Sequence, residues 1–160
     1  MEAVNWTIIE ASKQEEYLAA IELFKEYVAS LDFDLSFQNF DEELTIMPVM
    51  YGSQTGKLFL VKLGSEFIGC AGLRRIENDI TCELKRMYIK PAYRQLGVGK
   101  AIMRLAIDNA RVMGYELMKL DTIGYKMPLA VKLYKSYGFK ETVAYNYNPH
   151  EGVVYFELKL

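Results

Sequence analysis

The hydrophobic pattern of the chain changes from a strand-like to a helical period between residues 89 and 98. Before this point, an apolar stretch from about Ile80 to Ile89 is typical of a strand, and Pro91 ends it. After this point, apolar residues recur at helical spacing from about Gly97 until Gly114. A short strand, Leu117–Asp121, follows. The sequence therefore predicts a β-α-β unit in the second half of the chain, with a right-handed crossover.

The rest of the chain adds an antiparallel run of strands before this unit and more strands after it. Together these segments predict an α/β (α+β) fold: a mixed, mostly antiparallel central sheet with helices on both faces. At 160 residues the chain is expected to form a single domain, 1–160. The further elements that the pattern predicts are strand Trp6–Glu10, helix Gln14–Ser30, a helix capped by Asp41 that reaches about Met47 and is stopped by Pro48, strands Lys57–Leu63 and Phe67–Ile76, helix Pro128–Gly138, and strands Phe139–Tyr147 and Val153–Leu160.

Composition and charge exclude several classes of protein. Half of the residues (51%) are hydrophobic, which is enough for a full core, and a net charge of −2 argues against a dedicated nucleic-acid binder. The two cysteines, Cys70 and Cys82, lie in apolar strand-like stretches, as buried thiols in a reducing compartment would. The first ten residues lack the pattern of a secretory signal, and no apolar run is long enough to span a membrane. We therefore expect a cytoplasmic protein.

The segment between the middle strand and its helix predicts a phosphate site. It reads Arg94-Gln95-Leu96-Gly97-Val98-Gly99-Lys100-Ala101. Two glycines at a helix start let the backbone approach an anion, and the exposed N–H groups and the helix dipole favour negative charge there. The segment is not a Walker loop, because Ala101 follows Lys100, and it is not a dinucleotide fingerprint, because Ile102 occupies the third glycine position.

This segment resembles the phosphate loop of the GNAT superfamily of acyl-CoA N-acyltransferases, which reads Gln/Arg-x-x-Gly-x-Gly/Ala. A second block, Ala130-Val131-Lys132-Leu133-Tyr134-Lys135-Ser136-Tyr137-Gly138-Phe139, is similar to the family's Ala-x-x-Leu-Tyr-x-x-x-Gly-Phe. One position departs from the family pattern: Met127 stands where many members carry Asn, which puts a side-chain contact to pantetheine from there in doubt.

The resemblance implies a GNAT-type fold and acetyl-CoA as the cofactor. It implies that the backbone of Met87, Tyr88 and Ile89 pairs with the pantetheine arm like an added strand, and that Arg94, Gln95, Leu96, Gly97, Val98, Gly99, Lys100 and Ala101 bind the phosphates. The sequence itself hints at a β-bulge here, because Leu84, Met87 and Ile89 break strict alternation. Such a bulge would splay this strand from Leu117–Asp121. A strand buried on both faces is the alternative.

The implied chemistry is direct attack of a neutral primary amine on the thioester. A backbone N–H near Tyr88 would hold the oxyanion. Tyr134 is the candidate acid for the leaving thiolate, and a core tyrosine is the alternative. Glu83 is the candidate general base. The alternative for Glu83 is a structural carboxylate that bonds a neighbouring loop.

The acceptor site is less determined by the sequence. Phe33 and Phe37, with Phe40, could form the floor of an apolar pocket or fill the core. Arg86 could bind an acceptor carboxylate or simply pair with an acid. Tyr145 and His150 lie in the connection between the last strands, which shapes this site in the family. His150 is the only histidine, so no metal site is expected.

A small-molecule or amino-acid-like amine is the favoured acceptor, with no nucleic-acid or membrane partner expected. Acetylation of a protein N-terminus or lysine is the same chemistry, and a non-catalytic acyl-CoA-binding module is a further alternative. Exposed sheet edges are compatible with a homodimer and leave the oligomeric state open.

Overall fold

A computed structural model describes residues 4–31 and 39–160, so Phe33 and Phe37 lie outside the described residues. Seven strands form one sheet in the order β1-β2-β3-β4-β5-β7-β6. All neighbouring strands are antiparallel except β4 and β5, which are parallel. The sequence-predicted mixed, mostly antiparallel sheet is confirmed. The strands are β1 (Trp6–Glu10), β2 (Lys57–Leu63), β3 (Glu66–Arg75), β4 (Thr81–Ile89), β5 (Leu117–Ile123), β6 (Lys140–Thr142) and β7 (Val153–Lys159).

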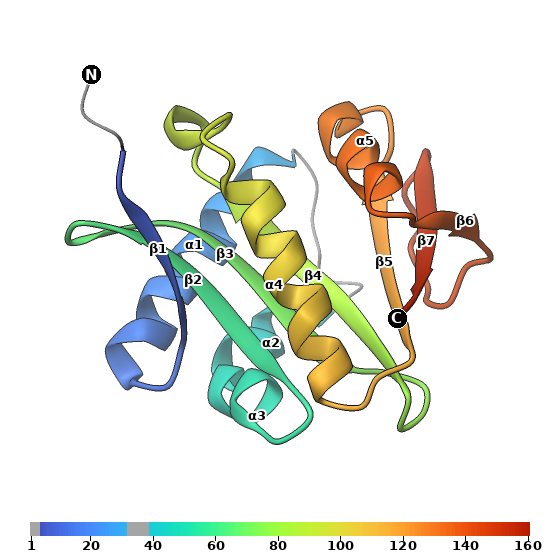
Figure 1. The fold of residues 1–160 in the computed structure, drawn as a ribbon, viewed down its shortest axis with the longest axis horizontal. Coiled ribbons are helices and arrows are strands. Elements are labelled where there is room, and N and C mark those ends of the chain that lie inside the picture. The colour runs from blue at the N-terminus through green and yellow to red at the C-terminus, as the bar shows by residue number, and fades with distance from the viewer. Residues whose placement is uncertain (1–3, 32–38) are drawn as a thin grey trace.

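Helices cover both faces of the sheet (Figure 1). One core, on the α4 and α5 side, holds Ile102, Met103 and Tyr134. The other core lies under α1, α2 and α3 and holds Phe24, Met47 and Tyr51. The helices are α1 (Gln14–Ser30), α2 (Phe40–Thr45), α3 (Met47–Gly52), α4 (Val98–Val112) and α5 (Pro128–Ser136), with a short 3-10 helix η2 (Pro91–Tyr93) after β4.

Local sequence explains where the two long helices form. At the start of α1, the Glu16 carboxylate accepts hydrogen bonds from the backbone N–H groups of Ser12 and Lys13, both at 3.0 Å. Along α4, the buried residues recur at three- and four-residue spacing, so one stripe packs on the sheet. Full burial of each large member stabilises the fold by about 1.5–3 kcal/mol. The buried residues of α4 are Val98, Ile102, Met103, Ala106, Ile107 and Ala110.

Three sequence-based boundaries were wrong. Pro48 does not stop a helix; it lies in the first turn of α3, where its missing N–H would have had no helical partner anyway. Helix α2 begins at Phe40 rather than after an Asp41 cap. The strand expected from Phe139 to Tyr147 is only Lys140–Thr142, because its pairing with β7 ends there.

The predicted bulge is present in β4. Cys70 pairs with Tyr88 and Gly72 with Lys85, so Arg86 and Met87 together oppose the one residue between Cys70 and Gly72. Arg86 adopts φ 57°, which is uncommon for a residue other than glycine, and its carbonyl accepts a hydrogen bond from the Cys70 thiol at 3.3 Å. The inserted residue places the Lys85 and Arg86 side chains on the same face, where both reach Glu43 of α2.

Strands β4 and β5 separate immediately before this bulge. Their parallel pairing comprises only Thr81–Glu83 with Leu117–Lys119, although both strands continue beyond it. Figure 1 shows the two strands diverging from a common end into a V. The backbone groups of β4 that face β5 beyond Glu83 therefore lack a partner strand.

Candidate functional site

A groove of about 1030 Å³ fills the V between β4 and β5. Its walls come from the end of β4, the loop before α4, the first turn of α4 and the length of α5. Of the residues that the sequence assigned to the cofactor, nine line it and two, Leu96 and Ala101, do not. The nine are Met87, Tyr88, Ile89, Arg94, Gln95, Gly97, Val98, Gly99 and Lys100.

The start of α4 has the geometry of an anion site. Gly97 adopts φ 81°, and among the described residues no atom lies within 4 Å of where its Cβ would be. The first helical hydrogen bond is donated by the N–H of Ala101 to the Gly97 carbonyl, which leaves the three preceding N–H groups without a helical acceptor. Arg94 is held beside them, since its Nε donates to the Ile89 carbonyl at 2.9 Å. This end of the groove can bind a phosphate-bearing ligand.

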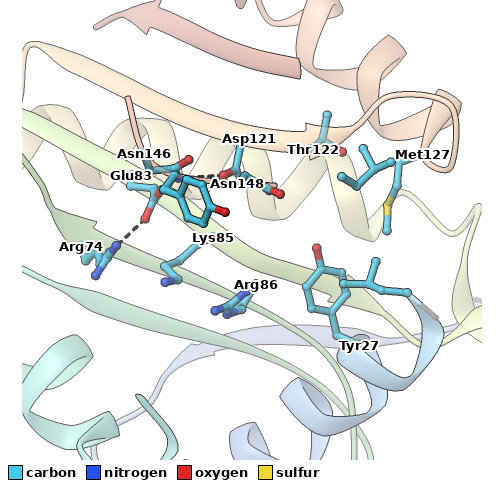
Figure 2. Close-up of a pocket in the computed structure, with 13 residues that line it drawn as sticks. Tyr27, Arg74, Glu83, Lys85, Arg86, Asp121, Thr122, Met127, Asn146 and Asn148 are labelled. Atoms are coloured by element: carbon cyan, nitrogen blue, oxygen red, sulfur yellow. Dashed lines mark hydrogen bonds and ion pairs between the residues drawn. The ribbon is translucent and has the colours of Figure 1, made fainter. Parts of the chain in front are cut away.

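A smaller pocket of about 200 Å³ continues from the groove on the side of α1 (Figure 2). Six residues line both spaces: Tyr27, Lys85, Arg86, Asp121, Thr122 and Met127. Lys126 links the loop after β5 to the end of α1. Its Nζ donates a hydrogen bond to the Leu31 carbonyl at 2.7 Å. The residues that line only the pocket are Leu31, Arg74, Glu83, Ile123, Asn146, Tyr147 and Asn148.

A buried ion cluster supports the floor of the pocket. Arg86 binds Glu43 with two hydrogen bonds, Nε to Oε2 at 3.0 Å and Nη2 to Oε1 at 3.1 Å, and Lys85 Nζ lies 3.0 Å from Oε1. The Tyr51 hydroxyl also donates to Glu43 Oε2 at 3.1 Å. Burial alone would raise the pKa of Glu43, but Lys85 and Arg86 outweigh it and lower that pKa to about 2. Glu43 therefore remains ionised.

Glu83 lies at the point where β4 and β5 separate, and it is 4% exposed. Arg74 Nε donates to its Oε1 at 2.9 Å, and the Tyr145 hydroxyl donates to its Oε2 at 2.7 Å. Tyr145 belongs to the connection between β6 and β7, so Glu83 does bond a neighbouring loop. Burial and the negative charges of Glu83 and Asp121 raise the pKa of Tyr145 far above its usual value, so this hydroxyl keeps its proton.

Asp121 is the second carboxylate of the pocket. Its Oδ2 accepts a hydrogen bond from Asn146 Nδ2 at 2.8 Å (Figure 2). Burial raises the pKa of Asp121, and the charge of Glu83 adds to this, although the bond from Asn146 acts in the opposite direction. Sequence reasoning missed this residue. The alternation of Lys119 and Asp121 with Met118 and Leu120 shows a polar strand face, but a solvent-exposed face has the same pattern.

Tyr134 lines the groove from α5 and is 8% exposed. Its ring packs against Phe139 and Phe156 at 6.0 and 6.2 Å between centroids. Burial raises its pKa above the usual range, and nearby Tyr27 and Asp121 raise it further. Its hydroxyl donates no hydrogen bond to any residue that the structure describes.

Of the described residues that the sequence assigned to acceptor binding, only Arg86 lines the groove or the pocket. Arg86 lines both spaces and pairs with Glu43. Phe40 packs under Arg86, with 5.2 Å between the guanidinium carbon and the ring centroid. Tyr145 and His150 line neither space, and the His150 N–H donates to Asn148 Oδ1 at 3.1 Å. The roles of these residues in acceptor binding stay predictions.

Residues 4–31 and 39–160 lack two kinds of feature, a metal-binding cluster and a membrane-spanning helix. They contain no group of three or more His, Cys, Asp or Glu side chains arranged to hold a metal ion. No helix within these ranges has the length and apolar character that a membrane span needs.

Comparisons with known proteins agree on one family. A model of the Acetyltransferase (GNAT) family matches residues 20–139. An uncharacterized N-acetyltransferase of Schizosaccharomyces pombe is 36% identical, covering 86% of this chain and 85% of its own length. An N-acetylaspartate synthetase of Danio rerio is 36% identical over 56% of this chain and 32% of its own. A crystal structure of an acetyltransferase from Streptococcus agalactiae shares the fold, with a TM-score of 0.80 at 21% identity, covering 97% of this chain and 98% of its own.

Proposed function

This chain belongs to the GNAT acetyltransferase family and is an N-acetyltransferase, and we propose that it acetylates the primary amine of a small, amino-acid-like acceptor by direct attack on acetyl-CoA. The observation that carries this proposal is the continuity of the two spaces. A long groove with an anion site at its far end opens into a small pocket of mixed charge. The six shared residues mark the place where donor and acceptor would meet.

The groove fits the donor. Its volume of about 1030 Å³ suits an extended ligand, and the start of α4 with Arg94 and Lys100 suits its phosphates. The unpaired edge of β4 at Met87, Tyr88 and Ile89 suits an arm that bonds like an added strand. Bound there, acetyl-CoA supplies an activated acetyl thioester.

The chain's own residues supply the proton transfers. Tyr134, buried on the groove side, would donate a proton to the leaving sulfur. A carboxylate of the pocket would accept the proton of the acceptor ammonium, and both Glu83 and Asp121 line that pocket. A backbone N–H near Tyr88 would stabilise the oxyanion, as the resemblance to the family implies.

The pocket supports a small acceptor. About 200 Å³ is below the ~300–1,000 Å³ of a site for a drug-sized ligand. Lys85 and Arg86 line it beside Asp121, so both signs of charge are available to a zwitterion. The similarity to an N-acetylaspartate synthetase points in the same direction. A protein N-terminus or lysine would have to enter past Tyr147 and Asn148, which line the pocket from the β6–β7 connection.

The test has two stages. In a thermal-shift titration, CoA and acetyl-CoA should stabilise the protein by about 2.7 kcal/mol at ~100 times Kd, and ATP should not. Acetyl-CoA is then supplied with the twenty free amino acids, spermidine and a peptide with a free N-terminus, and the release of free thiol is measured. Turnover with an amino acid is expected. Turnover only with the peptide would replace the small acceptor by a protein, and CoA binding without turnover would favour a non-catalytic module.

A further inference from the structure

We infer that Asp121, rather than Glu83, is the general base that takes the proton of the acceptor ammonium. This inference rests on the acetyl transfer proposed above. Nothing in the sequence pattern singles out Asp121, and it follows from where the structure places the two carboxylates and what each one bonds.

Asp121 and Glu83 differ in their position relative to the groove. Asp121 lines both the groove and the pocket, whereas Glu83 lines the pocket alone. Pairing between β4 and β5 ends at Glu83 and Lys119, and Asp121 lies two residues further along β5, in the separated part of the sheet. Because the amine must meet the thioester where the two spaces join, Asp121 is the carboxylate at the reacting end.

The two carboxylates also differ in how many of their oxygens are already hydrogen-bonded. Both oxygens of Glu83 already accept short hydrogen bonds, one from Arg74 at 2.9 Å and one from Tyr145 at 2.7 Å. Protonation would break a mostly buried ion pair with Arg74, whose side chain is 34% exposed against 6% for Glu83. Asp121 is bonded on Oδ2 by Asn146, and its Oδ1 accepts no hydrogen bond from the described part of the chain. One lone-pair site of Asp121 is therefore open toward the acceptor.

Glu83 has a different role, which its contacts with the β6–β7 connection indicate. Tyr145 and Asn146 are adjacent in the β6–β7 connection, and they bond Glu83 and Asp121 respectively. The Tyr145 ring is further fixed by Lys119, whose Nζ lies 5.5 Å from its centroid, and by an edge contact with Tyr155 at 5.4 Å. Glu83 is thus a positioning residue: it anchors the loop that orients the Asp121 carboxylate.

The surroundings of Asp121 favour the uptake of a proton. Burial and the negative charge of Glu83 raise its pKa, while Lys85 and Arg86, also on β4, lower it. Tyrosines on three further elements face it as well: Tyr27 on α1, Tyr134 on α5 and Tyr155 on β7, with Tyr145 on the adjoining loop. A carboxylate with a raised pKa is a stronger base than an exposed one.

The proton balance of the reaction is complete with these groups. The Asp121 carboxylate accepts one proton from the acceptor ammonium, and the free amine nitrogen forms a bond to the thioester carbonyl carbon. When the carbon–sulfur bond breaks, its electron pair goes to sulfur, which takes a proton from Tyr134. The second proton of the attacking nitrogen returns to Tyr134, and Asp121 releases its proton to water.

The test is Asp121→Asn, measured with acetyl-CoA and the amino acid that turns over best in the panel described above. At pH 7, kcat should fall on the order of 10²–10⁴-fold while the Kd of acetyl-CoA from calorimetry stays within about twofold. The defect should shrink as the pH approaches the pKa of the acceptor amine, because a neutral amine needs no base. Asp108→Asn, on the exposed face of α4, is the matched control and should keep wild-type kcat.

Glu83→Gln decides between the two carboxylates. If Asp121 is the base, this variant keeps the wild-type dependence of the rate on pH. The KM for the acceptor should rise, because the β6–β7 connection loses its bond from Tyr145 to an ionised Glu83. Loss of that pH dependence in Glu83→Gln, with Asp121→Asn retaining it, would overturn the inference and restore Glu83 as the base. An Asp121→Asn variant with a constant defect at every pH would assign it a structural role instead. Wild-type protein that turns over no amine at all would contradict the proposed function, which is a separate outcome.

Discussion

The buried cluster around Glu43 gives a prediction whose size can be worked out from the structure. Glu43 is 2% exposed and is bonded by Arg86, Lys85 and Tyr51. Glu43→Gln keeps the size of the side chain and removes the charge. Two cations then remain at the floor of the pocket without their shared carboxylate.

The magnitude follows from the pKa of Glu43. That pKa is 4.5 for an ordinary glutamate and about 2 in the folded chain. At about 1.4 kcal/mol per pKa unit, the ionised form stabilises the fold by about 3 kcal/mol at neutral pH. Truncation of one partner in buried ion pairs elsewhere costs a similar ~3–5 kcal/mol. We therefore expect Glu43→Gln to lower the free energy of unfolding by about 3 kcal/mol at pH 7.

The same pKa fixes how this loss depends on pH. Because the folded pKa lies below the unfolded one, the stabilisation is fully present above pH 4.5 and disappears as the pH falls toward about 2. At pH 3 the carboxylate is still ionised in the folded chain but is mostly protonated in the unfolded chain. The difference between wild type and Glu43→Gln should therefore shrink to about 1 kcal/mol there.

Urea denaturation at pH 7 and pH 3 measures both values, since a change in midpoint at constant slope is a change in stability. At pH 7 the loss corresponds to a Tm lower by about 6–12 °C for a chain of this length. The adjacent, exposed Glu42 provides the control, and Glu42→Gln should stay within about 0.5 kcal/mol of wild type at both pH values. Glu43→Gln that is as stable as this control, or that loses the same stability at pH 3 and pH 7, would contradict the assigned role of the Glu43 charge.

Two further predictions concern the groove. Gly97→Val and Gly114→Val each place a β-branched residue at positive φ, 81° and 90°, with open space around the new Cβ, so each should cost roughly 1–2 kcal/mol of stability. Only Gly97→Val should weaken CoA binding more than tenfold in calorimetry, because only Gly97 lies at the anion end of α4. If the two variants bound CoA equally well, the anion site could not lie at Gly97. Tyr134→Phe should lower kcat on the order of 10²-fold or more with little change in the Kd of acetyl-CoA. The control Tyr125→Phe, at an exposed position outside the groove, should leave both values unchanged. An undiminished kcat in Tyr134→Phe would make Tyr134 a core residue only.

Features that depend on local pattern were predictable from the sequence. Helix α1 has the predicted bounds, Gln14–Ser30, because apolar residues recur along it at helical spacing and its start is marked by polar residues. The bulge in β4 was also predictable, since an inserted residue changes which positions of a strand are apolar. The anion end of the groove was indicated by a local signal too, the two glycines at the start of α4.

Features that depend on long-range contacts were not predictable. Glu43 follows Asp41 and Glu42, and three acids at a helix start are normally solvated residues that complement the helix dipole. Only the fold brings Glu43 to Arg86, 43 positions away along the chain. The roles of Glu83 and Asp121 depend in the same way on Tyr145 and Asn146, which lie in a connection without regular structure.

The bulge at Arg86 links the two halves of the site. Before it, Glu83 and Lys85 face the pocket; after it, Met87 and Ile89 face the α4 core. Arg86 is the extra residue that makes this change of face, since these four positions would share one face in a regular strand. If Arg86 instead took an ordinary place in the strand, without a bulge, the positions after it would exchange faces: Met87 would turn toward the pocket, and Tyr88 would leave the α1 core for the α4 side. One inserted residue therefore directs Arg86 to Glu43 at the floor of the acceptor pocket and keeps the end of β4 packed along the groove. A change that removes the bulge should for this reason impair the donor groove and the acceptor pocket together.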